Sequence, residues 1–370
     1  MPNAITEKIS KLGFGYMRLP RTDDGFDKEQ IKRMADAFLE SGGTYFDAAF
    51  VYEGAEAALK ESVIDRYPRE RFQLATKLNL NFFNTQDEME NQFRTSFHRL
   101  GASYIDFYML HGINAKQNEK AEKLGAWTFL QDLQAKGLIH HLGFSFHGSP
   151  EDLEEILSRH PETEFCQLQI NYLDWDNPKI ASRRQYEIAR KYNVPVVIME
   201  PIKGGLLTGD SSPVAELLRE ANPAVSMASW ALRYALQLEG VMVVLSGMST
   251  FEQLSDNLAT FRDFKPISAD EQAVLDKAVS KFNAIPRVEC TECRYCVNDC
   301  PSKIPIPVVI DTYNDYLVHN TTTNIDGFYK MITRDGGKAC DCTACRVCES
   351  LCPQGIEIVD TLAKASALFD

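Results

Sequence analysis

The sequence predicts an α/β protein in which a (β/α)8 barrel precedes a small cysteine-rich domain, and three observations support this. The chain has 370 residues, enough for one large domain of about 250–300 residues and a small one. Up to about residue 262, short apolar or β-branched runs alternate with amphipathic segments of about 10–15 residues, which is typical of repeated βα units. Nine of the ten cysteines fall after residue 289, and eight of these nine form two closely spaced runs.

Eight segments have the composition of buried strands: Lys11–Gly15, Thr44–Ala48, Phe72–Lys77, Ile105–Leu110, His141–Ser145, Cys166–Ile170, Pro195–Met199 and Met242–Ser246. Helical patterns follow them at Lys28–Ser41, Glu53–Tyr67, Gln86–Leu100, Leu124–Lys136, Pro150–Arg159, Lys179–Tyr192, Ala224–Leu238 and Phe251–Phe261. Eight such units in about 250 residues favour a (β/α)8, or TIM, barrel over an open doubly wound sheet. No G-x-G-x-x-G opens a helix in this region, which also argues against the open sheet.

Charge and composition limit the partners. The 39 basic and 52 acidic residues give a net charge of −13, and the acidic excess is spread along the chain, which argues against nucleic acid or an anionic membrane surface as a partner. The first ten residues contain no apolar signal region, and no run approaches the ~18 apolar residues of a spanning helix. We therefore expect a cytoplasmic protein, in which cysteines at metal-ligand spacing are ligands rather than disulfides.

Four polar side chains follow successive predicted strands, where a barrel gathers its active-site loops. Asp47 and Tyr52 come after the second strand, Lys77 ends the third, and His111 follows the fourth. Each alone has an ordinary explanation, such as a helix cap, a packing residue, a solvated strand end or a loop histidine. All four at one rim favour a catalytic site.

The chemistry of these residues is complementary. A tyrosine with a pKa of about 10 donates a proton poorly at neutral pH. A lysine ammonium beside Tyr52 stabilises its phenolate, and Asp47 would hold Lys77 charged and oriented. His111 can donate a hydrogen bond to a substrate oxygen. The set suits protonation of an alkoxide as hydride arrives at its carbon.

At these residues the sequence resembles the aldo/keto reductase superfamily, from about Leu12 to Asn257. The similar stretches are L-G-F-G, F-D-A-A-F-V-Y-E, L-A-T-K-L, I-D-F-Y-M-L-H-G, L-G-F-S-F, F-C-Q-L-Q-I-N-Y and M-E-P-I-K-G-G-L-L-T-G. The resemblance implies a catalytic tetrad of Asp47, Tyr52, Lys77 and His111. It also implies that Ser145 and Gln167 hold a nicotinamide carboxamide and that Asn257 contacts adenine.

The chain departs from the family's pattern on the cofactor side. Phe146 stands where the family usually has asparagine, and Met199 replaces the aromatic residue that commonly stacks on the nicotinamide ring. The basic residues that usually hold a 2'-phosphate are replaced by Gly247, Met248 and Gln253. Lys203 is the candidate contact for a pyrophosphate. These departures leave NADP, NAD or a flavin open as the cofactor.

Two cysteine runs dominate the end of the chain. Residues 290–301 and 342–353 each have the pattern C-x2-C-x2-C-x3-C-P of bacterial ferredoxins. By the crossed ligation of that pattern, one [4Fe–4S] cluster is held by Cys290, Cys293, Cys296 and Cys352, and the other by Cys342, Cys345, Cys348 and Cys300. Zinc is the alternative, because C-x2-C pairs also suit tetrahedral sites. Cys340 is unassigned, and Cys166 is interpreted as a small buried hydrophobe.

These patterns divide the chain into a barrel over residues 1–284 and a ferredoxin-like domain over residues 285–370. A helical segment at Ala269–Ala284 is expected to complete the barrel, and Pro286 marks the boundary. The spacer between the cysteine runs is longer than a compact ferredoxin needs. It is expected to contain a helix around Val308–Val318.

Three functions remain open at this point. The first is reduction of a small aldehyde or ketone by a nicotinamide cofactor, with the clusters serving stability or regulation. The second is an enzyme whose clusters exchange electrons with an external redox partner. Because nicotinamide transfers hydride and a cubane takes single electrons, this needs a relay such as a flavin. The third is a non-catalytic redox sensor, which the intact tetrad disfavours.

Overall fold

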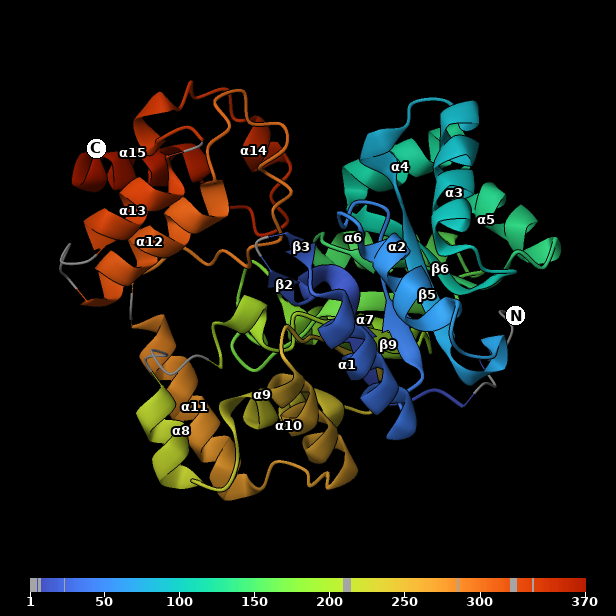
Figure 1. Ribbon diagram of the computed structural model, residues 1–370, viewed down its shortest axis with the longest axis horizontal. Coiled ribbons are helices and arrows are strands. Elements are labelled where there is room, and N and C mark those ends of the chain that lie inside the picture. Colours follow the sequence, from blue (N-terminus) through green and yellow to red (C-terminus); the bar gives the residue numbers. More distant parts are fainter. Residues whose placement is uncertain are drawn as a thin grey trace. The chain divides into compact units, whose positions relative to one another are not determined.

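The computed structural model describes residues 5, 8–22, 24–208, 214–284, 286–319, 325–334 and 336–370 (Figure 1). The chain forms two compact units. The first comprises Met1–Pro201 and Ala228–Ser268, and the second comprises Ile202–Met227 and Ala269–Asp370. Residues 202–227 thus belong to the second unit, although the residues directly before and after them belong to the first.

The first unit contains a closed barrel of eight parallel strands, in the order β1-β10-β9-β8-β7-β6-β5-β4. The strands are β1 (Leu12–Gly15), β4 (Tyr45–Asp47), β5 (Gln73–Asn79), β6 (Ile105–Ile113), β7 (Ile139–Phe146), β8 (Phe165–Gln169), β9 (Val196–Met199) and β10 (Val241–Gly247). All eight predicted strands are confirmed, with ends shifted by a few residues. A short antiparallel hairpin, β2 (Arg21–Thr22) with β3 (Gly25–Phe26), lies outside the barrel sheet.

Apolar side chains fill the barrel below the candidate site. Alternation along each strand points every second residue inward, and these residues meet in one buried cluster: Tyr45, Ala75, Phe107, Met109, Phe165, Val197, Val243 and Leu245. Aromatic rings dominate its packing. The ring centroid of Phe107 lies 5.2 Å from that of Tyr45 and 5.2 Å from that of Phe165. The interior is therefore a packed core, and polar residues follow it toward the C-terminal strand ends.

Helices connect the barrel strands: α1 (Lys28–Glu40), α2 (Ala55–Leu59), α3 (Gln86–Leu100), α4 (Ala115–Leu124), α5 (Ala126–Ala135), α6 (Pro150–Arg159), α7 (Ser182–Lys191), α9 (Met227–Leu236) and α10 (Phe251–Arg262). Capping explains two sharp starts, since Thr85 with Glu88 and Ser149 with Asp152 form capping boxes. The helix expected at Glu53–Tyr67 is shorter, because α2 passes into a π-helical turn at Lys60–Ile64. Helix α4 was not predicted from the sequence.

The second unit is helical, with α8 (Ala215–Ala221), α11 (Ala269–Asn283), α12 (Ile306–His319), α13 (Ile325–Ile332), α14 (Val347–Ser350) and α15 (Ile358–Phe369). Helix α12 confirms the helix expected in the spacer. Helix α11 packs on α8 and groups with this unit, so the predicted division at residue 284 stays a prediction. Of the helices in the described part of the chain, none is long and apolar enough to cross a membrane.

One glycine tests the barrel's packing. A Cβ at Gly143 in β7 would lie 2.3 Å from the backbone oxygen of Phe165, its partner in β8. We expect Gly143→Ala to lower the free energy of unfolding by about 1–3 kcal/mol, because a backbone atom in a paired strand cannot move aside. Gly15→Ala is the matched control, since its nearest contact is Ser246 O at 3.4 Å. Denaturant unfolding followed by circular dichroism measures both variants, and equal midpoints would contradict the prediction.

Candidate functional site

The predicted site residues of the barrel lie near the C-terminal ends of consecutive strands. Six strands contribute one each: Asp47 in β4, Lys77 in β5, His111 in β6, Ser145 in β7, Gln167 in β8 and Met199 in β9. The first five are buried and Met199 is half-buried. Tyr52 follows in the loop between β4 and α2 and is half-buried. The closed parallel barrel gathers residues that are far apart in the sequence at one rim.

A buried ion pair forms the base of this group. Lys77 Nζ donates to Asp47 Oδ1 at 2.5 Å and to the carbonyl oxygen of Ala48 at 2.6 Å. Burial raises the pKa of the Asp47 carboxyl and lowers the pKa of Lys77, and each charge opposes the shift of the other. Removing either residue would leave an uncompensated buried charge, which costs about 3–5 kcal/mol.

Tyr52 and His111 complete the group. Lys77 Nζ lies 5.1 Å from the centroid of the Tyr52 ring. The His111 ring stands edge-on to Tyr52, with the two centroids 6.0 Å apart and an interplanar angle of 86°. The structure therefore brings all four predicted catalytic residues together. An ammonium at this range favours the ionised form of a phenol.

Asn79 orients the imidazole and was not predicted from the sequence. It lies opposite His111 in the β5–β6 register, and its Nδ2 is 3.3 Å from His111 Nδ1. Because an amide nitrogen only donates, Nδ1 accepts and Nε2 carries the proton. Burial, with the charge of Lys77, holds the pKa of His111 well below its usual range. Asn79 stands two residues after Lys77 on the same strand face, and that spacing is the signal that could have found it.

A second network holds the loop that carries Tyr52. Glu56 is 1% exposed, and its Oε1 accepts from Thr76 Oγ1 at 2.8 Å. Arg99 Nη1 lies 3.3 Å from Glu56 Oε2 and donates to the carbonyl oxygen of Phe50 at 3.3 Å. Thr76 precedes Lys77, and Phe50 lies two residues before Tyr52. The network thus connects the strand that carries Lys77 to the loop that carries Tyr52. Glu56 was not predicted from the sequence, where its signal is a single charged residue in the stretch A-E-A-A-L.

Two side chains on neighbouring strands fit an amide ligand. Ser145 and Gln167 are paired in the register of β7 and β8. Ser145 Oγ accepts from the backbone N–H of Gly112 at 2.8 Å. Gln167 Oε1 is buried and has no hydrogen-bond partner among the described residues. Such an unpaired buried acceptor costs free energy until a donor arrives, and a carboxamide N–H is a suitable donor.

Two other residues that the sequence predicted as cofactor contacts, Asn257 and Lys203, do not come from the strand ends described above. Asn257 is buried in α10, where its Nδ2 donates to Ser246 Oγ at 2.9 Å. Phe146, in the position usually held by asparagine, is buried beside Phe144. Lys203 groups with the second unit, where its Nζ lies 3.4 Å from Glu289 Oε2. Its predicted contact with a pyrophosphate therefore stays a prediction.

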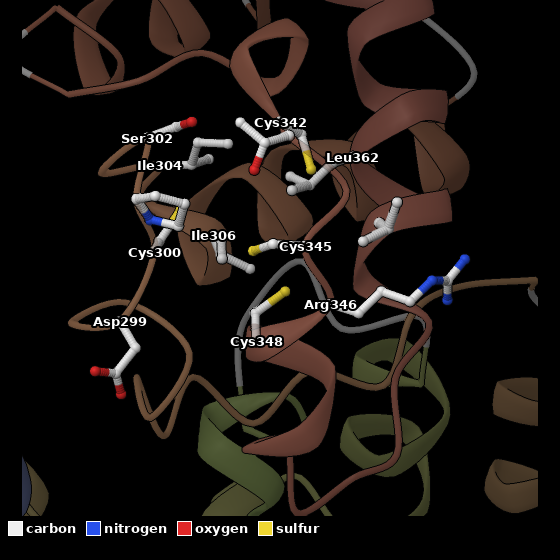
Figure 2. A pocket seen from close by; sticks show the side chains of 13 residues that line it. Asp299, Cys300, Ser302, Ile304, Ile306, Cys342, Cys345, Arg346, Cys348 and Leu362 are labelled. Carbon is white, nitrogen blue, oxygen red and sulfur yellow. The ribbon is translucent and has the colours of Figure 1, made fainter.

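Eight cysteines of the second unit line two cavities. Cavity I is lined by Cys290, Cys293, Cys296 and Cys352, with other residues. Cavity II is lined by Cys300, Cys342, Cys345 and Cys348, with other residues. Figure 2 shows these four side chains around one space in cavity II, with Arg346 extending away from it. Each cavity takes three cysteines from one run and one from the other, which is the grouping predicted by crossed ligation.

The backbone repeats itself around the two cavities. Glu292 and Arg294 have φ angles of 53° and 64°, and the equivalent Ala344 and Arg346 have 55° and 58°. Left-handed residues of this kind turn successive N–H groups toward an anion, and the Glu292 N–H donates to Cys290 Sγ at 3.4 Å. These features fit thiolates that bind a cationic cluster.

Burial adds an electrostatic reason for a cation in the cavities. It raises the pKa of Cys290 in cavity I and that of Cys348 in cavity II to about 11. Thiolates so placed need a positive partner, and a metal centre supplies one.

The two remaining cysteines line neither cavity. Cys166 is fully buried in β8, where burial raises the pKa of its thiol. Cys340 is exposed, and its backbone N–H donates to Asp370 Oδ2 at 2.9 Å. These placements agree with the interpretation of Cys166 as a buried hydrophobe and of Cys340 as a thiol outside the ligand sets.

Two family models match the chain in succession. Residues 11–280 match the model of the Aldo/keto reductase family, and residues 289–357 match that of the 4Fe-4S dicluster domain. The second match favours iron–sulfur over zinc for the cysteine runs. Together the models cover the barrel region and both cysteine runs.

Individual proteins resemble the first of these regions. The chain is 31% identical over 215 residues to an aldo-keto reductase, str7, of Strobilurus tenacellus, covering 54% of this chain and 60% of that protein. It is 29% identical over 245 residues to an aldo-keto reductase of Mycolicibacterium vanbaalenii, covering 65% and 80%. The structure of the holo form of aldo-keto reductase AKR11C1 from Bacillus halodurans superposes with a TM-score of 0.59 and 26% identity, covering 73% of this chain and 92% of that one.

The buried His111 predicts a pH dependence of stability. Because its pKa is lowered in the folded chain, the unfolded chain binds a proton below about pH 6.5 that the folded chain does not. The free energy of unfolding should therefore fall as the pH drops from 7 to 5, by up to about 1.4 kcal/mol per pH unit for this residue.

His111→Gln should make that fall shallower, since glutamine does not bind the proton. His98→Gln, at an exposed position of α3, serves as the control and should keep the full dependence. Urea midpoints at pH 7, 6 and 5 measure the effect. Identical slopes for His111→Gln and the unaltered chain would count against a neutral buried imidazole.

Proposed function

This chain belongs to the aldo/keto reductase family and carries a 4Fe-4S dicluster domain, and we propose that it reduces an aldehyde or ketone with a nicotinamide cofactor, using Tyr52 as the acid. One observation carries the proposal. The buried Lys77–Asp47 pair places an ammonium 5.1 Å from the Tyr52 ring, with His111 edge-on to the same ring. A small carbonyl compound is the corresponding substrate class.

The proton step follows from this arrangement. When bound, a nicotinamide cofactor would supply the hydride for the carbonyl carbon. Tyr52 gives its phenolic proton to the carbonyl oxygen, and the Lys77 ammonium stabilises the phenolate that remains. Asp47 favours the charged form of Lys77 against the desolvation that lowers its pKa. The ion pair therefore makes a weak acid usable near neutral pH.

His111 has a separate task in the proposed mechanism. Because Nδ1 accepts from Asn79, Nε2–H is the donor of the ring and is proposed to donate to the substrate oxygen when substrate is bound. Since the pKa of His111 is held well below its usual range, the imidazole is neutral at pH 7. It orients and polarises the carbonyl without competing with Tyr52 as the acid.

Four barrel residues are proposed to hold the cofactor. Ser145 and Gln167 would bind the carboxamide, because Gln167 Oε1 is an unpaired buried acceptor. Met199 would lie against the ring, and Asn257 near the adenine. NADP and NAD are both candidates, although replacement of the residues that usually hold a 2'-phosphate weakens the case for NADP in particular. A flavin is a further candidate, given the altered position at Met199.

We also propose that cavities I and II each hold one [4Fe–4S] cluster, since each has four cysteines in the crossed arrangement. A second candidate function then follows from an exposed ligand. Cys345 of cavity II is exposed, which favours exchange of single electrons with an external partner. Coupling that exchange to hydride chemistry requires a one-electron relay such as a flavin in the barrel.

A cytoplasmic location is proposed from the sequence alone. A non-catalytic redox sensor is the weakest alternative, because a retired site has no reason to keep a buried ion pair that costs desolvation.

Replacing Tyr52 tests the mechanism. Tyr52→Phe should reduce carbonyl turnover by about 10²–10⁴-fold, the range expected for loss of a general acid, with the Kd for NADPH unchanged. Tyr186→Phe is the control: it makes the same chemical change outside the site, at a hydroxyl that donates to the carbonyl oxygen of Glu239. It should leave carbonyl turnover unchanged. Steady-state kinetics with a panel of aldehydes and ketones, and fluorescence titration of NADPH, provide the measurements. Unchanged turnover in Tyr52→Phe would refute the assigned role.

Metal content and cysteine variants separate the two functions. Anaerobic protein should contain about eight irons per chain, and about four would contradict two occupied cavities. Cys340→Ser is the control and should keep all the iron. In the double variant Cys293→Ala/Cys345→Ala, carbonyl reduction by NADPH that survives cluster loss supports the first function. Loss of turnover in a folded variant that still binds NADPH supports electron exchange.

A further inference from the structure

Lys203 lies in an unusual place for a lysine. The segment from Ile202 to Met227 groups with the helical second unit. The Lys203 side chain is 0% exposed, and its Nζ lies 3.4 Å from Glu289 Oε2 in the same unit. Glu289 directly precedes Cys290, which lines cavity I. The buried ammonium of Lys203 is thus paired with the residue that directly precedes a lining cysteine of cavity I.

The backbone holds the lysine there. Lys203 has a φ of 46°, in the left-handed region, which is unfavourable for a non-glycine residue. Gly204 follows with a φ of 66°, and a Cβ on it would lie 2.8 Å from the carbonyl oxygen of Thr291, another lining residue of cavity I. Strain of this kind persists only where the surroundings impose it. The Lys203–Gly204 segment is therefore seated against the loop of the first cysteine run.

We propose that Lys203 sets the reduction potential of the cluster in cavity I, rather than binding a nucleotide pyrophosphate. The proposal rests on the occupancy of the cavities put forward above. Adding one electron makes a thiolate-bound cluster more negative, so a nearby positive charge stabilises the reduced form and raises the potential. Glu289 opposes this effect, but its side chain is 33% exposed whereas Lys203 is fully buried. Water screens the Glu289 carboxylate more than the Lys203 ammonium. Removing Lys203 would therefore make the field at cavity I, where Glu292 and Asp311 also act on Cys290, more negative.

The repeated architecture supplies an internal comparison. Arg294 and Arg346 occupy equivalent positions of the two runs, both with left-handed φ, and each lines its own cavity. The Arg346 side chain is 60% exposed and is paired with Glu349 at 2.8 Å, so solvent screens its charge. Both runs therefore have an arginine at the equivalent position, whereas the buried Lys203 is paired next to the run that begins cavity I.

This difference gives the clusters an order. With the higher potential in cavity I, a reduced cluster in cavity II would pass one electron to an oxidised cluster in cavity I, so that the first would be oxidised as the second was reduced. Cavity II has the exposed cysteine Cys345 and would be the entry point for a one-electron donor.

The test measures reduction potentials in the full chain with its clusters. Under anaerobic conditions, dithionite with mediators reduces the protein stepwise, and electron paramagnetic resonance follows each reduced cluster. A Cys345→Ala background, which removes a ligand from cavity II, identifies the signal of cavity I. Lys203→Met should lower the cavity I midpoint by about 59 mV or more, the equivalent of a tenfold change in a one-electron equilibrium. The cavity II midpoint should move by less than half as much.

Matched variants separate charge from packing. Lys203→Arg keeps the charge and should keep the midpoint close to its original value. Glu289→Gln removes the opposing charge and should raise the cavity I midpoint. Arg346→Gln removes a screened charge and should leave both midpoints nearly unchanged. The Kd for NADPH, from fluorescence titration, should be the same in Lys203→Met as in the unaltered chain.

Three outcomes would decide against the proposal. An unchanged cavity I midpoint in Lys203→Met with full iron content overturns it, and a tenfold weaker binding of NADPH in that variant would assign Lys203 to the nucleotide instead. If Lys203→Met does not retain its iron, an unchanged midpoint in Glu289→Gln overturns it. Absence of iron and of cluster signals in the unaltered chain would refute the cluster occupancy itself, which is a separate failure.

Discussion

The buried pair of Lys77 and Asp47 is the constraint on which the barrel site depends. Two buried charges must stay paired at short distance, because separating them would leave the desolvation cost of each uncompensated. The closed sheet keeps them paired, since β4 and β5 are adjacent and their register fixes both side chains. Asn79, on the same strand as Lys77, orients His111. Glu56 and Arg99 hold the loop that carries Tyr52.

The second unit meets a similar problem with a different solution. Its cysteines gather two sets of thiols, most of them partly buried, whose ionised forms repel one another. A cationic centre in each cavity, as proposed, would remove that repulsion. The unit also has an apolar core, in which Ile304, Val309 and Tyr329 are buried. Helices α12, α13 and α15 build this core from segments between and beyond the cysteine runs. The cysteine loops are therefore supported by packing as well as by the ligands they are proposed to hold.

The sequence predicted the features that follow from strong local rules. Strand periodicity predicted the eight barrel strands, and fixed cysteine spacing predicted which four side chains line each cavity. It did not predict helix α4, because Ala115–Leu124 has only Ala121 and Asn118 buried and lacks an apolar stripe. It missed Asn79 and Glu56, whose importance lies in contacts across strands and loops. It also gave no sign that Lys203 would pair with Glu289, 86 positions away, since that contact depends on the tertiary path of the chain.

The shared lining of the two cavities has a consequence for biogenesis. Cavity I needs Cys352 from the second run, and cavity II needs Cys300 from the first. Cavity II lacks three of its four cysteines until the second run has been synthesised, and cavity I lacks Cys352 until the end of that run. The barrel strands precede both runs in the sequence, so the barrel can fold first during synthesis. If the clusters bind as proposed, their insertion would follow folding of the barrel, and a chain truncated between the runs would lose one ligand of cavity I and three of cavity II.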